Sequence, residues 1–202
     1  MEILYKIQAM KGKSVFAIVL AAGQSSRFGN TKQLENYQGV PLVLRSVRLA
    51  EAVCGSHSVL VAGNDWQRVS EICAPLAGFF VVNPQFAEGL ASSIECGIRS
   101  IAEVADAVLL LLADQPLITS THLQLLVDTW QASENSIVAS AYAGTSGPPV
   151  IFPRRDFADL LRLSGDRGAR SIIEANSERV KLVEFEPAAL DIDRRSDLER
   201  TS

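Results

Sequence analysis

Small and charged residues gather in one stretch directly after the first apolar run of the chain. The stretch reads Leu20-Ala21-Ala22-Gly23-Gln24-Ser25-Ser26-Arg27-Phe28-Gly29-Asn30-Thr31-Lys32. Its glycines and other small residues would let backbone N–H groups approach a ligand closely, as in loops that bind phosphates. Arg27 could meet an oligophosphate as a fork and Lys32 as a point charge. The residues alone leave open a structural glycine turn with solvated cations.

One carboxylate, Asp114, stands where the most apolar run of the chain ends, just before Gln115 and Pro116. The apolar run predicts a central strand, because strands covered on both faces are continuously apolar. Open α/β sheets bind ligands at the carboxyl ends of such strands, and a hard oxygen donor suits Mg²⁺ bridged to phosphate oxygens. The alternative is a turn, or a cap for the helix expected after Thr119.

Two more carboxylates, Asp191 and Asp193, precede the last helix expected in the chain. In an extended segment, residues two apart point to the same side, so one or both could complete a Mg²⁺ site begun by Asp114. Helix capping or a solvated turn explains them equally well on composition.

Ser92 and Ser93 lie at the start of an expected helix, within the stretch 89–94. The free N–H groups of a first helical turn and two hydroxyl groups could meet a base or a ribose. Capping of the helix also accounts for the serines.

Histidine and tryptophan are not expected to take part in chemistry. His57 and His122 are isolated, and the chain has no Ser/His/Asp or Cys/His arrangement that would indicate a protein nucleophile. Trp66 and Trp130 fall on expected helices, where packing is the simpler role.

The first motif resembles the signature L-A-A-G-x-S-x-R-x-G-x-x-K of the MobA-like nucleotidyltransferase superfamily, which includes the molybdenum cofactor guanylyl- and cytidylyltransferases. The chain matches every fixed position of this pattern. The resemblance implies that the loop contacts a nucleoside triphosphate and that the Asp of the D-Q-P element holds a metal ion. The expected nucleotide-binding residues are Ala21, Ala22, Gly23, Arg27, Lys32, Ser92, Ser93 and Asp114.

The other motifs resemble elements of the same superfamily. Asp191-Ile192-Asp193 is similar to the D-I-D-T-P element, with Arg194-Arg195 in place of T-P; of its two carboxylates we expect Asp193 to be the second metal ligand. The stretches 147–150 and 165–170 resemble the G-x-P-V and G-D-x-G-A-R elements of the cytidylyltransferase branch, which implies that they shape the acceptor side.

The resemblance implies transfer of CMP from CTP to a molybdopterin-type cofactor, with release of pyrophosphate and Mg²⁺ as cofactor. Arg27, Lys32 and Asp114 are then the catalytic residues. The alternatives are a guanylyltransferase, an enzyme with another small phosphorylated acceptor, or a non-catalytic molybdenum cofactor carrier. A molybdoenzyme or its chaperone is a further possible partner.

The arrangement of apolar runs predicts an α/β fold. Short buried runs alternate with segments of helical period, which is typical of a mainly parallel sheet with crossover helices. We therefore expect a Rossmann-like three-layer sandwich, of the nucleotide-diphospho-sugar transferase type by resemblance. Strands are expected at 15–20, 58–62, 79–82, 107–112, 136–141, 150–152 and 180–183, and helices at 41–53, 65–73, 89–101, 119–131, around 157 and 172, and from 196.

The composition argues against several classes of protein. The chain has 202 residues and a net charge of -4, which argues against a nucleic-acid surface. Its three cysteines suggest reduced thiols rather than a disulfide framework. With no membrane segment and no secretory signal expected, the cytoplasm is the expected location. We expect residues 1–13 to form an N-terminal extension and 14–202 a single domain.

Overall fold

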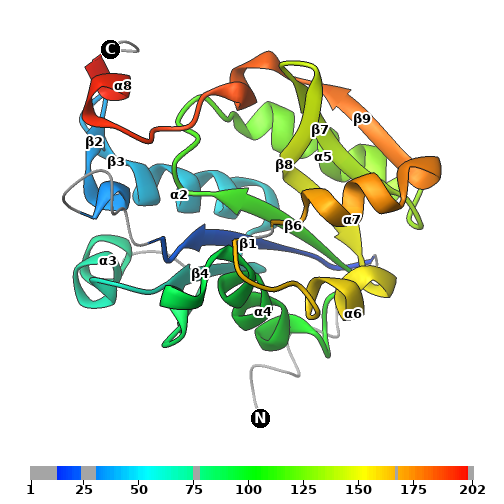
Figure 1. The fold of residues 1–202 in the computed structure, drawn as a ribbon, viewed down its shortest axis with the longest axis horizontal. Coiled ribbons are helices and arrows are strands. Elements are labelled where there is room, and N and C mark those ends of the chain that lie inside the picture. Colours follow the sequence, from blue (N-terminus) through cyan, green and yellow to red (C-terminus); the bar gives the residue numbers. More distant parts are fainter. Residues whose placement is uncertain (1–12, 24–30, 75–77, 167, 200–202) are drawn as a thin grey trace.

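The apolar runs form the strands of a seven-stranded sheet with helices on both faces (Figure 1). The computed structural model describes residues 13–23, 31–74, 78–166 and 168–199. The strands follow the order β5-β4-β1-β6-β8-β7-β9 across the sheet. They are β1 (Val15–Ala21), β4 (Ser58–Ala62), β5 (Phe79–Val82), β6 (Ala107–Leu112), β7 (Ile137–Tyr142), β8 (Thr145–Pro153) and β9 (Val180–Glu184). A separate pair is formed by β2 (Asn36–Tyr37) and β3 (Val40–Pro41).

The helices make the two outer layers. Helices α2, α3 and α5 pack on one face of the sheet, and α4, α6 and α7 pack on the other. They are α2 (Leu42–Cys54), α3 (Trp66–Cys73), α4 (Leu90–Ile101), α5 (Ser120–Gln131), α6 (Phe157–Leu160), α7 (Arg170–Ala175) and α8 (Arg195–Glu199). Short 3-10 turns are η1 (Lys32–Leu34), η2 (Phe86–Glu88), η3 (Arg154–Asp156), η4 (Ser177–Arg179) and η5 (Glu186–Ala189). The predicted three-layer α/β sandwich is confirmed.

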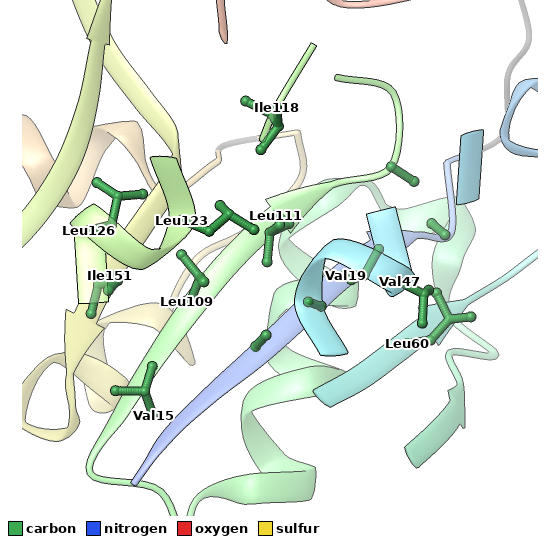
Figure 2. Packing of buried hydrophobic residues seen from close by; sticks show 14 of the residues in the cluster. Val15, Val19, Val47, Leu60, Leu109, Leu111, Ile118, Leu123, Leu126 and Ile151 are labelled. Atoms are coloured by element: carbon green, nitrogen blue, oxygen red, sulfur yellow. The ribbon is translucent and has the colours of Figure 1, made fainter. Parts of the chain in front are cut away.

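The core between β1, β6 and the helices explains why these strands are so apolar. Leu109 and Leu111 of β6 pack beneath Leu123 of α5, and Val19 of β1 lies beside Val47 of α2 (Figure 2). The opposite faces of the same strands pack against α4. Both faces are therefore removed from water, and each buried aliphatic side chain contributes roughly 1.5 to 3 kcal/mol.

The sheet is mainly parallel, as predicted, with β8 as the exception. Strand β8 runs antiparallel to both neighbours, β6 and β7. It joins β7 through Ala143 and Gly144, which have φ values of 49° and 71°, as a tight hairpin turn requires. The prediction of a strand limited to 150–152 was wrong, because the prolines before it suggested a loop. The pairing of β8 with β7 shifts its register between Ala139 and Ser140. Pro148 and Pro149 lie opposite this shift, where proline is tolerated because the strand does not need to donate a backbone N–H there.

The start of α3 differs from expectation in one residue, Trp66. Asp65 is the N-cap of α3, with a left-handed backbone at φ of 54°, and its side chain makes no capping bond. Its carboxylate instead accepts a hydrogen bond from the Thr31 hydroxyl. Trp66, predicted to pack, is 40% exposed, whereas Trp130 is buried in the core. The first turn of α3 therefore faces solvent and contacts the segment that follows the loop.

The remaining expectations concern the cysteines and the ends of the chain. All three cysteines are free; Cys73 is buried, and Cys54 and Cys96 are half-buried. Residues 1–12 of the expected extension lie outside the described residues, and Lys13 forms an ion pair with Glu134. Within the described part of the chain, no helix has the length and apolar character needed to cross a membrane.

Candidate active site

The carboxyl ends of β1 and β6 lie side by side and define the site. The two strands are parallel neighbours, with Leu20 opposite Leu112, and the Ala113 N–H donates to the Leu20 carbonyl at 3.2 Å. In the sheet, β1 lies between β4, the next strand of this sheet along the chain, and β6. The order in which the strands are added therefore changes direction at β1. Open α/β sheets bind their ligands at such a point.

The expected nucleotide loop begins at this edge. Ala21 and Ala22 are buried at the end of β1, and Gly23 follows them. The Gln33 amide donates to the Gly23 carbonyl at 3.2 Å, which ties the far end of the loop back to its start. Residues 24–30, including Arg27, lie outside the described residues. The described ends of the loop are thus held together beside β6.

Three predicted site residues meet in one charged cluster. The Lys32 Nζ donates to Asp114 Oδ2 at 2.6 Å and to Asp193 Oδ1 at 3.0 Å. The side chains of Lys32 and Asp114 are 14% and 19% exposed, and that of Asp193 is 60% exposed. Burial lowers the pKa of Lys32, but the charges and hydrogen bonds of the two carboxylates outweigh it and raise the pKa overall. Lys32 therefore stays protonated between the carboxylates.

The segment that carries Asp193 reaches the site from the far edge of the sheet. After β9 and η5 it crosses over the end of the sheet toward β2 and β3 (Figure 1). The Ile192 N–H donates to the Asp114 carbonyl at 2.9 Å, and the Ile192 side chain is fully buried with Tyr37 and Leu42. Because Ile192 points inward, its neighbours Asp191 and Asp193 both face outward. The alternation expected from the sequence is confirmed.

The charges of this cluster also affect the pKa of Asp191. Burial and the nearby charge of Asp114 raise the pKa of Asp191 to about 6, although a hydrogen bond from Gln115 opposes the rise. Asp193 is the member of the pair that contacts Lys32. The geometry thus favours Asp193 as the partner of Asp114, and its role as a metal ligand stays a prediction.

The carboxylates can be tested for their fit to a divalent cation. Asp114 Oδ1 is buried and has no hydrogen-bond partner among the residues that the structure describes, so it is a candidate ligand oxygen. No group of three or more His, Cys, Asp or Glu side chains that could hold a metal occurs in the part of the chain that the structure describes. Mg²⁺ commonly takes only one or two protein carboxylates and completes its shell with water and substrate phosphates. Asp114 and Asp193 fit that pattern.

The predicted serines belong to a polar network at the start of α4. The buried Asn83 amide donates to Ser92 Oγ at 2.9 Å and to Ser93 Oγ at 3.1 Å. Ser92 Oγ in turn donates to the Gly89 carbonyl, so neither serine is the N-cap of the helix. Nucleotide binding by the serines stays a prediction. Sequence reasoning missed Asn83, although a polar residue at the end of a strand was a usable signal.

The elements expected on the acceptor side lie at two places around the site. The Gly165 carbonyl accepts the Ala91 N–H at 3.0 Å, and a side chain at Gly89 would come within 2.5 Å of Gly165. The stretches 89–94 and 165–170 are therefore in contact, except that residue 167 lies outside the described residues. The stretch 147–150 lies at the start of β8, and the Pro148 carbonyl accepts a hydrogen bond from Gln115 at 3.3 Å.

The histidines pack against aromatic rings, His122 in the interior and His57 in a half-buried position. His57 stacks on Phe16, with ring centroids 4.5 Å apart. His122 stacks on Phe185 and bonds to Ser140 at 2.8 Å. Burial lowers the pKa of both histidines, that of His122 to about 4, so both are neutral at physiological pH. Their surroundings suit packing rather than proton transfer.

Comparison with known proteins shows to which family the chain belongs. Among curated proteins, the chain is 27% identical to purine catabolism protein PucB of Bacillus subtilis over 174 residues, which covers 82% of this chain and 83% of PucB. Among solved structures, it is similar to Rv0371c of Mycobacterium tuberculosis, with a TM-score of 0.80 and 26% identity over 95% of this chain and 98% of that one.

A second structure of that mycobacterial protein is a complex with manganese. It matches with a TM-score of 0.79 and 25% identity, covering 94% of this chain and 98% of that one. The model of the MobA-like NTP transferase domain matches residues 17–180, which include β1 from its third residue on, all of β6 and the stretch between Gly23 and Lys32. The chain therefore belongs to the family of MobA-like NTP transferase domains, and it is a nucleotidyltransferase.

Proposed function

We propose that the protein transfers CMP from CTP to a molybdopterin-type acceptor and releases pyrophosphate, with Mg²⁺ held by Asp114 and Asp193. The observation that carries the proposal is the cluster of Lys32 with these two carboxylates at the carboxyl ends of β1 and β6. A triphosphate bound by the loop after β1 would bring its phosphates to this cluster.

The reaction is an in-line displacement that needs no protein nucleophile. An oxygen of the acceptor's terminal phosphate attacks the α-phosphorus of CTP, and the bond from that phosphorus to the oxygen bridging to the β-phosphate breaks. Pyrophosphate leaves with the bonding electrons. Catalysis then consists of positioning the phosphates and of stabilising the charge that develops on them.

Lys32 and Arg27 supply the positive charge for the leaving group. Lys32 is already held at the site by its contacts with Asp114 and Asp193. When a triphosphate enters, the ammonium group is close enough to turn toward it and to donate hydrogen bonds to the departing pyrophosphate. Arg27 belongs to the same loop and would bind the phosphates as a fork.

The two carboxylates are the acceptors for the metal. Asp114 would offer Oδ1, for which the described part of the chain provides no hydrogen-bond partner, and Asp193 would approach from the exposed side of the cluster. When bound, Mg²⁺ would supply positive charge that stabilises the negative charge developing on the phosphates in the transition state. The manganese complex of Rv0371c supports a divalent cation in this family.

The choice of CTP and of a molybdopterin-type acceptor rests on the elements that resemble the cytidylyltransferase branch. The stretches 89–94 and 165–170 contact each other, and the stretch 147–150 lies beside Gln115 at the end of β6. Such proximity is what two substrates sharing one site require, because the acceptor must reach the α-phosphorus of the bound nucleotide.

The deciding experiment measures pyrophosphate release from CTP, GTP, ATP and UTP with Mg²⁺, each with and without a molybdopterin-type acceptor. We expect release from CTP that depends on the acceptor. Asp114→Ala should lower turnover by at least about a hundredfold, since it removes the buried metal ligand. Asp159→Ala is the matched control, because Asp159 is an exposed carboxylate that pairs with Arg162.

Each other outcome selects a different function. Release from GTP would assign the guanylyl branch, and release with another phosphorylated acceptor would replace molybdopterin. Binding of nucleotide without any release would favour a cofactor carrier. Full turnover by a folded Asp114→Ala variant would contradict the proposed metal site.

A further inference from the structure

A buried amide directly follows the carboxylate at the end of β6. Gln115 is only 2% exposed. Its Nε2 donates to the Ala188 carbonyl at 2.9 Å and to the Pro148 carbonyl at 3.3 Å. A primary amide has two N–H donors, and the two carbonyls share them with the Asp191 carboxylate, which also accepts from Gln115. The turn after β6 is thereby tied to two other segments of the chain.

These two segments border the charged cluster. Pro148 lies in β8, at the irregularity where the strand passes the end of β6. Ala188 lies in η5, a few residues before Asp191 and Asp193. One side chain therefore links the turn that holds Asp114 with the segment that carries Asp193, although the two are far apart in sequence.

Asp193 depends on such links for its position. Its side chain is 60% exposed, so burial of its own atoms does little to hold it near Lys32. The segment is held by the hydrogen bond from Ile192 to the Asp114 carbonyl, by the buried Ile192 side chain, and by the bond from Gln115 to Ala188. Of these, the Gln115 bond is the side-chain hydrogen bond that originates next to Asp114.

We propose that Gln115 is a positioning residue that sets the placement of Asp193 relative to Asp114, and through it the affinity of the carboxylate pair for a divalent cation. This inference rests on the proposed metal site. Gln115 itself does not touch the metal or the substrates. Replacing the amide with an apolar side chain of similar size would leave two buried carbonyls without their donors, and the segments would move to regain hydrogen bonds.

The test is a Mn²⁺ titration followed by the EPR signal of the free ion, with Mn²⁺ alone and with a nonhydrolysable CTP analogue. Gln115→Met keeps the volume and removes both donors. We expect it to raise the Kd for Mn²⁺ about tenfold to a hundredfold, the usual effect of losing a residue that orients a metal ligand. Should this variant not fold, Gln115→Asn, whose shorter amide cannot bridge both carbonyls, takes its place with the same expectation.

A matched control separates positioning from a general loss of stability. Ile98→Ala truncates a buried side chain of α4, which packs on the face of the sheet opposite to Ala188. It should lower the melting temperature and leave the Kd for Mn²⁺ unchanged. An unchanged Kd in a folded Gln115 variant would overturn the inference.

The failure of this inference and that of the proposed function can be told apart. If Asp114→Ala abolishes Mn²⁺ binding while Gln115→Met does not weaken it, the metal site stands and the positioning role is wrong. If Asp114→Ala binds Mn²⁺ as tightly as the unmodified protein, the proposed metal site is wrong, and the inference falls with it. The titration with Mn²⁺ alone does not depend on CTP being the donor.

Discussion

The buried imidazole of His122 makes the stability of the protein depend on pH in a way that can be calculated. Ser140 Oγ donates to the Pro149 carbonyl, so it must accept its other hydrogen bond from His122 Nε2–H. The ring also stacks on Phe185 at 4.0 Å. Burial lowers the pKa of His122 from 6.5 to about 4. The native state therefore favours the neutral ring.

The sign and size of the effect follow from linkage. Between pH 6.5 and pH 4 the unfolded chain binds the proton and the native state does not, so native stability falls as the pH falls through this window. Above the unfolded pKa the full stability is present. The loss amounts to about 2 kcal/mol at pH 5 and approaches about 3 kcal/mol in more acidic solution.

Urea unfolding at pH 7.5 and pH 5 measures this loss directly. The reference is His122→Gln, whose amide can donate to Ser140 but does not titrate in this range. We expect the protein to lose about 2 kcal/mol more than this variant between the two pH values. Parallel losses in the two proteins would refute the assignment of a neutral, buried imidazole.

Two further predictions concern an ion pair and the metal. Asp156 is buried and receives two hydrogen bonds from Arg179, at 2.5 and 2.8 Å, so Arg179→Met should cost about 3 to 5 kcal/mol by leaving a buried carboxylate unpaired. The exposed Arg162→Met serves as control and should cost under about 1 kcal/mol in the same urea titration; equal losses would contradict the prediction. Chelation with EDTA should abolish pyrophosphate release, and added Mg²⁺ or Mn²⁺ should restore it; release that survives EDTA would exclude a metal-dependent reaction.

The sequence alone predicted where β6, Asp114 and the loop after β1 lie, because the apolar and glycine-rich patterns of these segments agree with their places in the sheet. The run 107–112 is apolar on both faces, so its central place in the sheet followed from composition, and Asp114 had to lie at the edge where parallel strands end. The glycine loop after β1 had to lie at the same edge. These elements required no knowledge of long-range contacts.

What the sequence did not reveal are features that depend on distant segments. The start of β8 looked like a loop, since a strand irregularity that accommodates two prolines becomes visible only when β7 is paired beside it. The roles of Gln115 and Asn83 were missed for the same reason: each is a buried amide whose acceptors come from elsewhere in the chain. The left-handed backbone of Asp65 likewise depends on where Thr31 lies.

The meeting of Lys32, Asp114 and Asp193 explains how the fold can hold two carboxylates close together before any ligand arrives. Two carboxylates sharing a site repel each other, and partial burial of Asp114 adds a desolvation cost. The Lys32 ammonium bonds to both and offsets one of the two negative charges. In the proposed reaction, Asp114 and Asp193 would hold a divalent cation that supplies this positive charge, which would leave Lys32 to donate to the phosphates. One side chain, Lys32, would thus stabilise the carboxylate pair first and serve the leaving group afterwards.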